Sequence, residues 1–151
     1  MSFECTPDVA DDTASTIKQA WDLWTTLNLP NVMIKVPGTS AGIPAIEELT
    51  ARGVNVNTTL LFARRRYRQV IDAYLSGLEQ RVRHGKPLDG VASVASFFVS
   101  QIDAVADLHL AADSPLRGTI ATANARRAYR LYQQRFSSPR WQRLVDRGAR
   151  Q

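Results

Sequence analysis

Cysteine and histidine are scarce in this chain of 151 residues, which contains one cysteine, two histidines and no compositionally biased tract. A single cysteine excludes an internal disulfide and any zinc site built from several cysteines. The two histidines, His84 and His109, have no local acidic cluster, so we expect no metal site. No apolar run is long enough to cross a bilayer, and residues 1–5 lack the basic and apolar regions of a signal peptide. We therefore expect a cytoplasmic protein without a membrane partner.

What is present is typical of an ordinary globular domain. The composition is 44% hydrophobic and 22% charged, and the length suits one domain. Neither an internal repeat nor a linker interrupts the sequence, so residues 1–151 are expected to form a single unit. The net charge of +5 permits binding to phosphate-bearing ligands. It does not choose between nucleic acid, a membrane surface and a small sugar phosphate.

The hydrophobic pattern predicts strands that alternate with helices. Runs of apolar and β-branched residues indicate strands within residues 3–6, 31–39, 54–62 and 91–100. Apolar residues at spacings of three and four indicate helices near 12–28, 40–52, 63–84, 103–110 and 121–136, with a short one from Pro139. This order predicts an α/β fold with a parallel sheet. Because the strands are nearly continuous apolar runs, both faces of the sheet are expected to be covered.

Signals at the helix ends support these boundaries. Asp11 or Asp12 is a candidate N-cap for the first helix, and Thr39 or Ser40 for the second. Gly53 is a natural residue to follow the C-terminus of the second helix.

Lys35 lies in the middle of an apolar strand, in the run "NVMIKVPGT" of residues 31–39. The ordinary interpretation is a lysine whose stem packs on neighbours while its amine reaches solvent. The functional interpretation starts from the carboxyl edge of a parallel sheet, where α/β proteins build their sites. An amine enclosed by apolar residues loses hydration and its pKa falls. A neutral amine is a nucleophile that forms a Schiff base with a carbonyl substrate.

Three longer stretches carry a resemblance to a known family. "SFECTPDVADDTAST", "NVMIKVPGTSAGIPAIEELTARGVNVNTTLLF" and "GVASVASFFVSQID" closely resemble transaldolase, in its longer bacterial subfamily. The resemblance runs over nearly the whole chain, in order and with similar gaps. It implies a segment of a (β/α)₈ TIM barrel, with about four of the barrel strands present in this chain.

The resemblance also implies a reaction. A dihydroxyacetone unit would pass from sedoheptulose 7-phosphate to glyceraldehyde 3-phosphate, in the pentose phosphate pathway. These sugar phosphates would be the partners of the enzyme, a transferase. No metal or organic cofactor is implied, because the lysine imine itself accepts the electrons of the broken carbon–carbon bond.

Site residues are carried over by matching positions. Lys35 matches the lysine that forms the Schiff base, and Glu4 matches the acid/base glutamate that works through a water. Thr59 matches the threonine that positions this water. Asn57 matches an asparagine that contacts the dihydroxyacetone unit, and Ser96 matches a serine in the same pocket. Each also has an ordinary interpretation as a solvated carboxylate or a strand side chain with backbone partners.

Two other polar strand residues have weaker claims. Asn55 has no role that the resemblance supplies, and Ser93 is interpreted as a small packing residue.

The sequence departs from the family pattern in two ways. Gln101 stands where the family has an arginine that binds substrate phosphate. An amide donates a hydrogen bond but supplies neither the charge nor the bidentate fork, so we expect weaker phosphate binding, with Ser100 as a minor helper. The chain is also shorter than the roughly 250 residues of a full barrel. An internal fragment of the barrel is therefore expected, with open strand edges that favour self-association or pairing with a complementing half.

Two alternative functions remain open from the sequence. The arginines at 64–66, 68, 126, 127 and 130 could form a basic nucleic-acid-binding module. The favoured interpretation is that they are the exposed faces of amphipathic helices, so no nucleic-acid partner is predicted. The second alternative is a transaldolase remnant that has lost its activity. Among active enzymes, an aldolase that cleaves fructose 6-phosphate is the nearest neighbour, and Glu4 favours transfer over cleavage.

Overall fold

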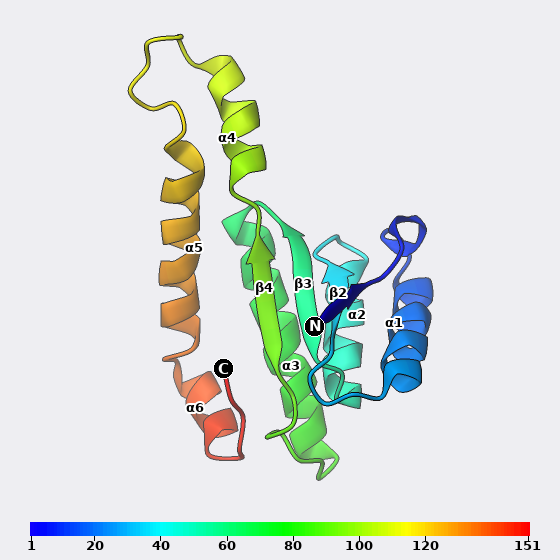
Figure 1. Cartoon of the computed structure of the whole chain (residues 1–151). Coiled ribbons are helices and arrows are strands. Elements are labelled where there is room, and N and C mark those ends of the chain that lie inside the picture. Colours follow the sequence, from blue (N-terminus) through cyan, green and yellow to red (C-terminus); the bar gives the residue numbers. More distant parts are fainter.

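Four parallel strands form one sheet in the order β1-β2-β3-β4 in the computed structural model, which describes residues 1–151. The strands are β1 (Ser2–Glu4), β2 (Met33–Pro37), β3 (Val56–Leu61) and β4 (Ser93–Phe97). Figure 1 shows the strands side by side in chain order, each connected to the next through a helical crossover. The predicted parallel α/β arrangement is thus confirmed.

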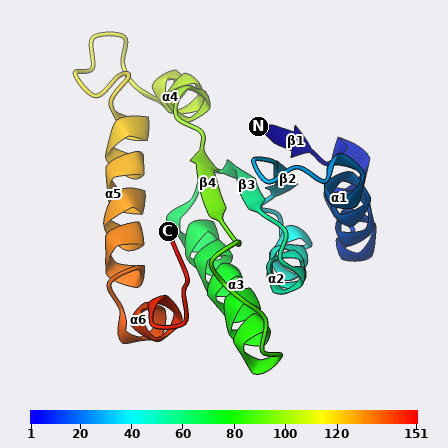
Figure 2. The same cartoon turned by 60° about the horizontal axis from the view of Figure 1, so that its bottom comes forward.

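Six α-helices accompany the sheet. They are α1 (Thr13–Leu27), α2 (Gly42–Arg52), α3 (Arg64–Arg83), α4 (Ser100–Ala106), α5 (Ile120–Arg135) and α6 (Pro139–Val145). Two short 3₁₀ turns, η1 (Pro7–Val9) and η2 (Asp107–His109), complete the elements. In Figure 1, α2 and α3 lie behind the sheet, and in Figure 2 they lie below it. In Figure 1, α4 and the upper part of α5 project beyond the carboxyl ends of the strands.

The helix-end signals predicted at Asp12 and Gly53 are confirmed, and Asn28 adds a third helix-end signal that was not predicted. Asp12 caps α1, since its carboxylate accepts a hydrogen bond from Ser15 N at 2.6 Å. Asn28 and Gly53 end α1 and α2 in the left-handed region, with φ of 43° and 95°. The second helix differs slightly, because Ala41 is its N-cap residue. Thr39 nevertheless serves this helix end, since its hydroxyl accepts from Gly42 N at 2.9 Å.

One helix begins earlier than the sequence indicated. The predicted helix at 103–110 is α4, which starts at Ser100 and passes into η2 at Asp107. The reason is that β4 ends at Phe97, three residues before the predicted strand end. Apolar residues 97–99 fit a strand and a strand-to-helix turn equally well, so periodicity alone could not separate them.

The core fills the layer between the sheet and the two helices behind it. Ile34, Val36 and Val56 of the strands and Leu49 of α2 are all 0% exposed. Gly77 of α3 allows α2 to approach closely, because a Cβ there would lie 2.6 Å from the Glu47 carbonyl oxygen. This layer holds the strands in register and so fixes where their other side chains point.

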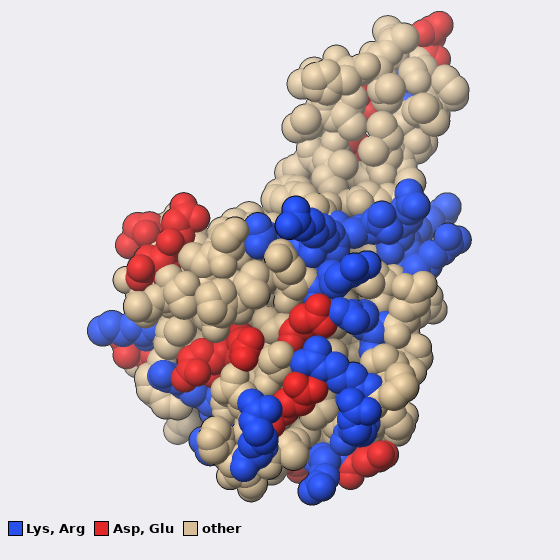
Figure 3. Space-filling model, turned by 180° about the vertical axis from the view of Figure 1, so that it is seen from behind, with Lys and Arg blue, Asp and Glu red and all other residues tan.

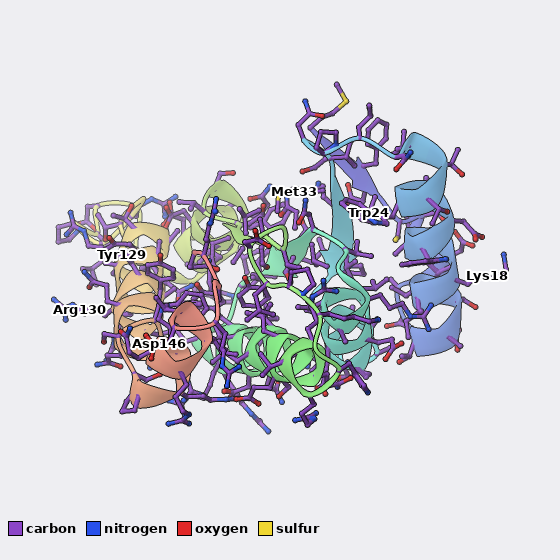
Figure 4. The ribbon with its side chains drawn as sticks, turned by 90° about the horizontal axis from the view of Figure 1, so that it is seen from below. Lys18, Trp24, Met33, Tyr129, Arg130 and Asp146 are labelled. Atoms are coloured by element: carbon purple, nitrogen blue, oxygen red, sulfur yellow. The ribbon has the colours of Figure 1, made fainter.

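The opposite face of the sheet has no helix over it. We call this the open face and the one packed on α2 and α3 the helix face (Figure 1). The expectation that both faces are covered is therefore wrong for this chain. In Figure 4, which views the molecule from below, Met33 of β2 lies on the side away from α2 and α3. The prediction treated each strand as one apolar run. In the structure, the apolar residues at alternate positions of each strand cover only the helix face, and polar side chains occupy the open face.

Candidate active site

Lys35 and Glu4 meet on the open face. They are direct partners in the parallel register of β1 and β2, so their side chains leave neighbouring strands at the same level. Lys35 Nζ lies 2.9 Å from Glu4 Oε2 and donates a hydrogen bond to it. The two side chains are 27% and 50% exposed. Two residues that are 31 positions apart in the sequence thus form a cation–carboxylate pair on the sheet.

The environment of Lys35 differs from the one that its sequence neighbours indicated. Ile34 and Val36 are 0% exposed and face the helices. Because side chains alternate along a strand, Lys35 points the other way, toward the open face. The expectation of an amine enclosed by its apolar neighbours is therefore wrong for this chain, in which the amine is partly exposed and paired with a carboxylate.

Asn57 continues the row on the next strand. It is the register partner of Lys35 in the pairing of β2 with β3. Its side chain accepts a hydrogen bond from the Ser96 hydroxyl at 2.8 Å and donates one to Ser2 Oγ at 3.2 Å. Side chains from β1, β3 and β4 are thereby tied together around the lysine. Ser2 was missed by the sequence analysis, although its two-residue spacing from Glu4 places both on one face of β1.

Thr59 and Gln101 are less closely connected to the pair. Thr59 lies two residues beyond Asn57 on β3, is paired with Pro37, and is 1% exposed. Strand alternation places it on the open-face side, toward the carboxyl edge. Gln101 lies at the start of α4, where its side-chain oxygen accepts a hydrogen bond from Ser100 at 3.1 Å. No hydrogen bond joins Gln101 to the strand residues.

The two polar residues with weaker claims have structural surroundings. Asn55 is 7% exposed, donates to Val32 O at 3.3 Å and accepts from Ala92 N at 2.8 Å, so it links segments that precede three strands. Ser93 lines an apolar cavity with Tyr67 and Phe97. Both observations agree with a packing or linking role.

A hollow adjoins Glu4 at the carboxyl ends of the first strands. Its volume is about 420 Å³, and Glu4, Cys5, Thr6, Pro7, Pro37 and Leu60 line it. This volume falls within the range of roughly 300–1,000 Å³ that small-molecule sites occupy. The hollow leaves room for a small ligand next to the carboxylate of the pair.

Cys5 is not available as a nucleophile in this hollow. Burial, with a smaller contribution from the Glu4 charge, raises the pKa of its thiol from 9.0 to about 11. The thiol is consequently protonated near neutral pH, and the thiolate is the reactive form.

Two further findings concern metals and membranes. The structure contains no group of three or more His, Cys, Asp or Glu side chains that could hold a metal ion. None of its helices combines the length and the apolar character needed to span a membrane.

The parallel sheet, its helical crossovers and the polar open face define part of a TIM barrel that carries a lysine–glutamate pair. Comparison with known families places it further: the model of the transaldolase/fructose-6-phosphate aldolase family matches residues 1–143. The chain belongs to this family.

Several curated proteins are similar to this chain over almost its whole length. A transaldolase of Parafrankia sp. is 46% identical over 155 residues, and one of Saccharopolyspora erythraea is 46% identical over 153 residues. Transaldolase 1 of Streptomyces avermitilis is 47% identical over 154 residues. Each alignment covers 99% of this chain and 41–42% of the relative. The chain thus spans about two fifths of the length of the curated relatives it matches.

Proposed function

We propose that this chain carries the Schiff-base half of a transaldolase reaction, with Lys35 as the nucleophile. The reaction moves a dihydroxyacetone unit from sedoheptulose 7-phosphate to glyceraldehyde 3-phosphate, a step of the pentose phosphate pathway. The observation that carries this proposal is the contact of 2.9 Å between Lys35 Nζ and Glu4 Oε2 on the open face. Membership of the transaldolase/fructose-6-phosphate aldolase family supports it.

The chemistry begins with the amine. Lys35 Nζ must lose a proton before it attacks the ketose carbonyl, and the Glu4 carboxylate at 2.9 Å is positioned to accept that proton. Attack gives a carbinolamine, which loses water to form the protonated imine. The bond between the alpha carbon of the imine and the next, hydroxyl-bearing carbon then breaks. Its electron pair moves through the alpha carbon to the imine nitrogen, and the hydroxyl proton of the leaving carbon passes to a base, a role that we assign to Glu4. An aldose phosphate leaves, and the three-carbon unit remains on Lys35 as an enamine.

The second half of the reaction reverses these steps. The enamine carbon attacks the aldehyde of the acceptor, and water hydrolyses the new imine to release the product and the free lysine. Each step moves one proton to or from an oxygen near Glu4, and we assign this acid/base work to Glu4, acting directly on Lys35 or through a water. Thr59 would position that water. No metal or organic cofactor is required, because the imine supplies the electron sink.

Asn57 and Ser96 bind the three-carbon unit in this proposal. Their mutual hydrogen bond of 2.8 Å holds an amide and a hydroxyl beside the strand of Lys35. Both groups donate and accept hydrogen bonds, which suits the hydroxyls of dihydroxyacetone.

Gln101 makes phosphate binding the weakest part of the site. It supplies no charge for the substrate phosphate, and its side chain is exposed at the start of α4. We expect Gln101→Arg to lower the Michaelis constant for the phosphorylated donor. The Michaelis constant for dihydroxyacetone, which carries no phosphate, should not change. An equal effect on both substrates would argue against a phosphate role for position 101.

Residues 1–151 are proposed to act as one partial barrel unit. β1 and β4 are the outer strands of the sheet, so each has one unpaired edge, and such edges favour pairing with further strands. We propose that a complementing barrel half or a second copy covers the open face and shields the lysine from bulk water. Sedimentation of the purified chain, alone and with the remaining segment of a transaldolase relative, tests this; a monomer in both samples would contradict it.

A transfer assay tests the proposed function. The chain, with and without that complementing segment, is incubated with sedoheptulose 7-phosphate and glyceraldehyde 3-phosphate, and fructose 6-phosphate is detected by mass spectrometry. We expect product from the wild-type chain and from Lys86→Arg, and none from Lys35→Arg. Lys86 is a matched control because it is exposed and lies in the connection between α3 and β4.

The remnant alternative is separated by comparing this assay with imine trapping. Gln101 and the partial barrel favour that alternative. A chain that forms a reducible imine on Lys35 but makes no product in either sample is a remnant that has kept its nucleophile and lost the transfer step.

A further inference from the structure

Five arginines surround one cavity on the outer side of the molecule, away from the open face. The cavity has a volume of about 370 Å³ and lies between α3 and α5. Its lining consists of Arg64, Arg65 and Arg68 of α3 and Arg127, Arg130, Leu131 and Gln134 of α5. We call it the arginine cavity. No acidic residue lines it.

The helical spacing of these residues explains why they converge. Arg64 and Arg68 are four positions apart on α3, and Arg127 and Arg130 are three apart on α5. Residues at these spacings share one face of a helix. Because α5 packs against α3, two basic faces meet along the same groove. In Figure 3, blue atoms gather in a band at the base of the projecting part of the molecule.

The arginines of the cavity have no carboxylate partners. None of them takes part in any of the ion pairs of the structure, and the sequence of α5 contains no acidic residue at all. Figure 4 shows Arg130 projecting from the outer side of α5.

The arginines that join α3 to the end of α5 and to α6 are different. Arg140 donates to Glu79 at 2.7 Å and to Asp72 at 3.3 Å, and Arg135 also pairs with Asp72. The hydrogen bond from Arg140 holds the pKa of the Glu79 carboxyl below its ordinary value. The arginines that join α3 to α5 and α6 are therefore paired with carboxylates. The arginines that line the cavity have no carboxylate beside them.

The unpaired arrangement is unfavourable for folding. Like charges at this helical spacing repel each other, and cations in the first turn of α3 oppose the helix dipole. The first turn of α3 has no acidic residue and no side-chain cap to compensate. A bound polyanion would relieve the repulsion and would also favour the dipole, since helix N-termini attract anions.

We propose that the arginine cavity binds a compact polyphosphate, either free or as the phosphate chain of a nucleotide. Five guanidinium groups exceed the two charges of a phosphate monoester, and their planar forks match phosphate oxygens. The cavity volume is at the lower end of the range for small-molecule sites. This site is separate from the open face, so the proposal does not depend on the proposed reaction.

The shape of the site favours a small ligand over nucleic acid. The arginines line a hollow of small-molecule size, and no aromatic side chain lines it for base stacking. Tyr67, the aromatic residue within the basic stretch 64–68, is 7% exposed and packs edge-on against Phe97.

Calorimetric titration of the whole chain at low salt tests the proposal. Inorganic tripolyphosphate is expected to bind one per chain, at least about tenfold more tightly than orthophosphate, since each charge-assisted contact contributes roughly that factor. A nucleoside triphosphate that binds more tightly than tripolyphosphate would identify a nucleotide as the source, and equal affinity would identify free polyphosphate. Equal affinity for tripolyphosphate and orthophosphate, or no binding, would overturn the proposal.

A pair of variants locates the site. Arg68→Gln/Arg127→Gln should weaken tripolyphosphate binding about tenfold or more. Arg143→Gln/Arg147→Gln removes the same charge from a different hollow, next to Glu79 and Asp146, and should change the affinity less than about twofold, in keeping with general screening of distant charges. Equal losses in the two variants would overturn the proposal.

Thermal unfolding and an oligonucleotide provide two further readouts. Without ligand, the cavity variant should unfold at the same temperature as the wild type or higher, because repulsion is removed; a lower temperature would mean that these arginines serve the fold. A short single-stranded oligonucleotide should bind more weakly than tripolyphosphate. Tighter binding of the oligonucleotide through Arg68 and Arg127 would overturn the small-ligand proposal and indicate nucleic acid.

Discussion

The helix face and the open face of the sheet take their side chains from the same strands, in alternation, yet they have opposite character. Ile34 and Val36 are 0% exposed on the helix face, whereas Lys35 between them is 27% exposed and paired with Glu4. The helix face is held by apolar packing, and the open face by side-chain hydrogen bonds between strands. A strand can thus be buried on one side for stability while it presents reactive groups on the other.

The largest expected difference between the faces is in stability. Ile34→Ala removes a fully buried side chain from the core layer and should lower the free energy of unfolding by about 2–5 kcal/mol. Met33→Ala, the neighbouring change on the open face, should cost much less because this side chain is already partly exposed. Denaturant unfolding of both variants measures this, and similar losses would mean that the open face is covered by packing in solution.

The reactivity of Cys5 probes the edge between the two faces. With its pKa raised from 9.0 to about 11, its thiolate fraction at neutral pH should be about a hundredfold below that of an ordinary thiol. Alkylation with iodoacetamide should therefore be slow in the folded chain, rise with pH toward 11, and be fast in urea. Glu4→Gln should accelerate it by a smaller factor, because the carboxylate is the lesser of the two causes. An unchanged alkylation rate in Glu4→Gln would show that the Glu4 charge does not contribute to the raised pKa of this thiol.

The same shift predicts a pH dependence of stability. The folded chain holds the Cys5 proton more tightly than the unfolded chain, so this contribution is present below about pH 9 and is lost as the pH rises toward 11. Burial also raises the pKa of Tyr67 to about 12, which extends the loss to higher pH. We expect the thermal midpoint to fall progressively above pH 9, and a constant midpoint up to pH 11 would contradict this.

The smallest effect is expected from the hydrogen-bond network. Ser96→Ala removes the donor to Asn57 and should cost about 0.5–1.5 kcal/mol of unfolding free energy. On the helix face, Thr58→Val is a matched control, since it removes a buried hydroxyl that has no hydrogen-bond partner and keeps the side-chain volume. A larger loss for Thr58→Val than for Ser96→Ala would reverse the proposed order.

Sequence reasoning succeeded where local patterns determine structure. The parallel α/β order, the Asp12 cap and the Gly53 helix end follow from residues within a few positions of one another. The direction in which Lys35 points was also accessible, because alternation with Ile34 and Val36 fixes it. The interpretation of Lys35 as enclosed by Ile34 and Val36 did not take into account that neighbouring side chains of a strand point to opposite faces.

The cross-strand contacts were beyond local patterns. The pairing of Glu4 with Lys35 depends on the register of β1 with β2, and the bonds of Asn57 to Ser2 and Ser96 depend on three strands. Registers are set by packing of the whole helix layer. The absence of acids around the arginine cavity likewise depends on how α5 sits on α3.

Borohydride trapping tests the central claim, that Lys35 is an imine-forming nucleophile on the open face. The chain has three lysines, Lys18, Lys35 and Lys86. Lys18 is an internal control, since it projects from the outer side of α1 and pairs with Asp22 (Figure 4). After incubation with dihydroxyacetone and borohydride, peptide mass mapping should find the reduced adduct on Lys35 and neither of the other two. Equal labelling of all three lysines, or an unmodified Lys35 in a folded sample, would contradict the account.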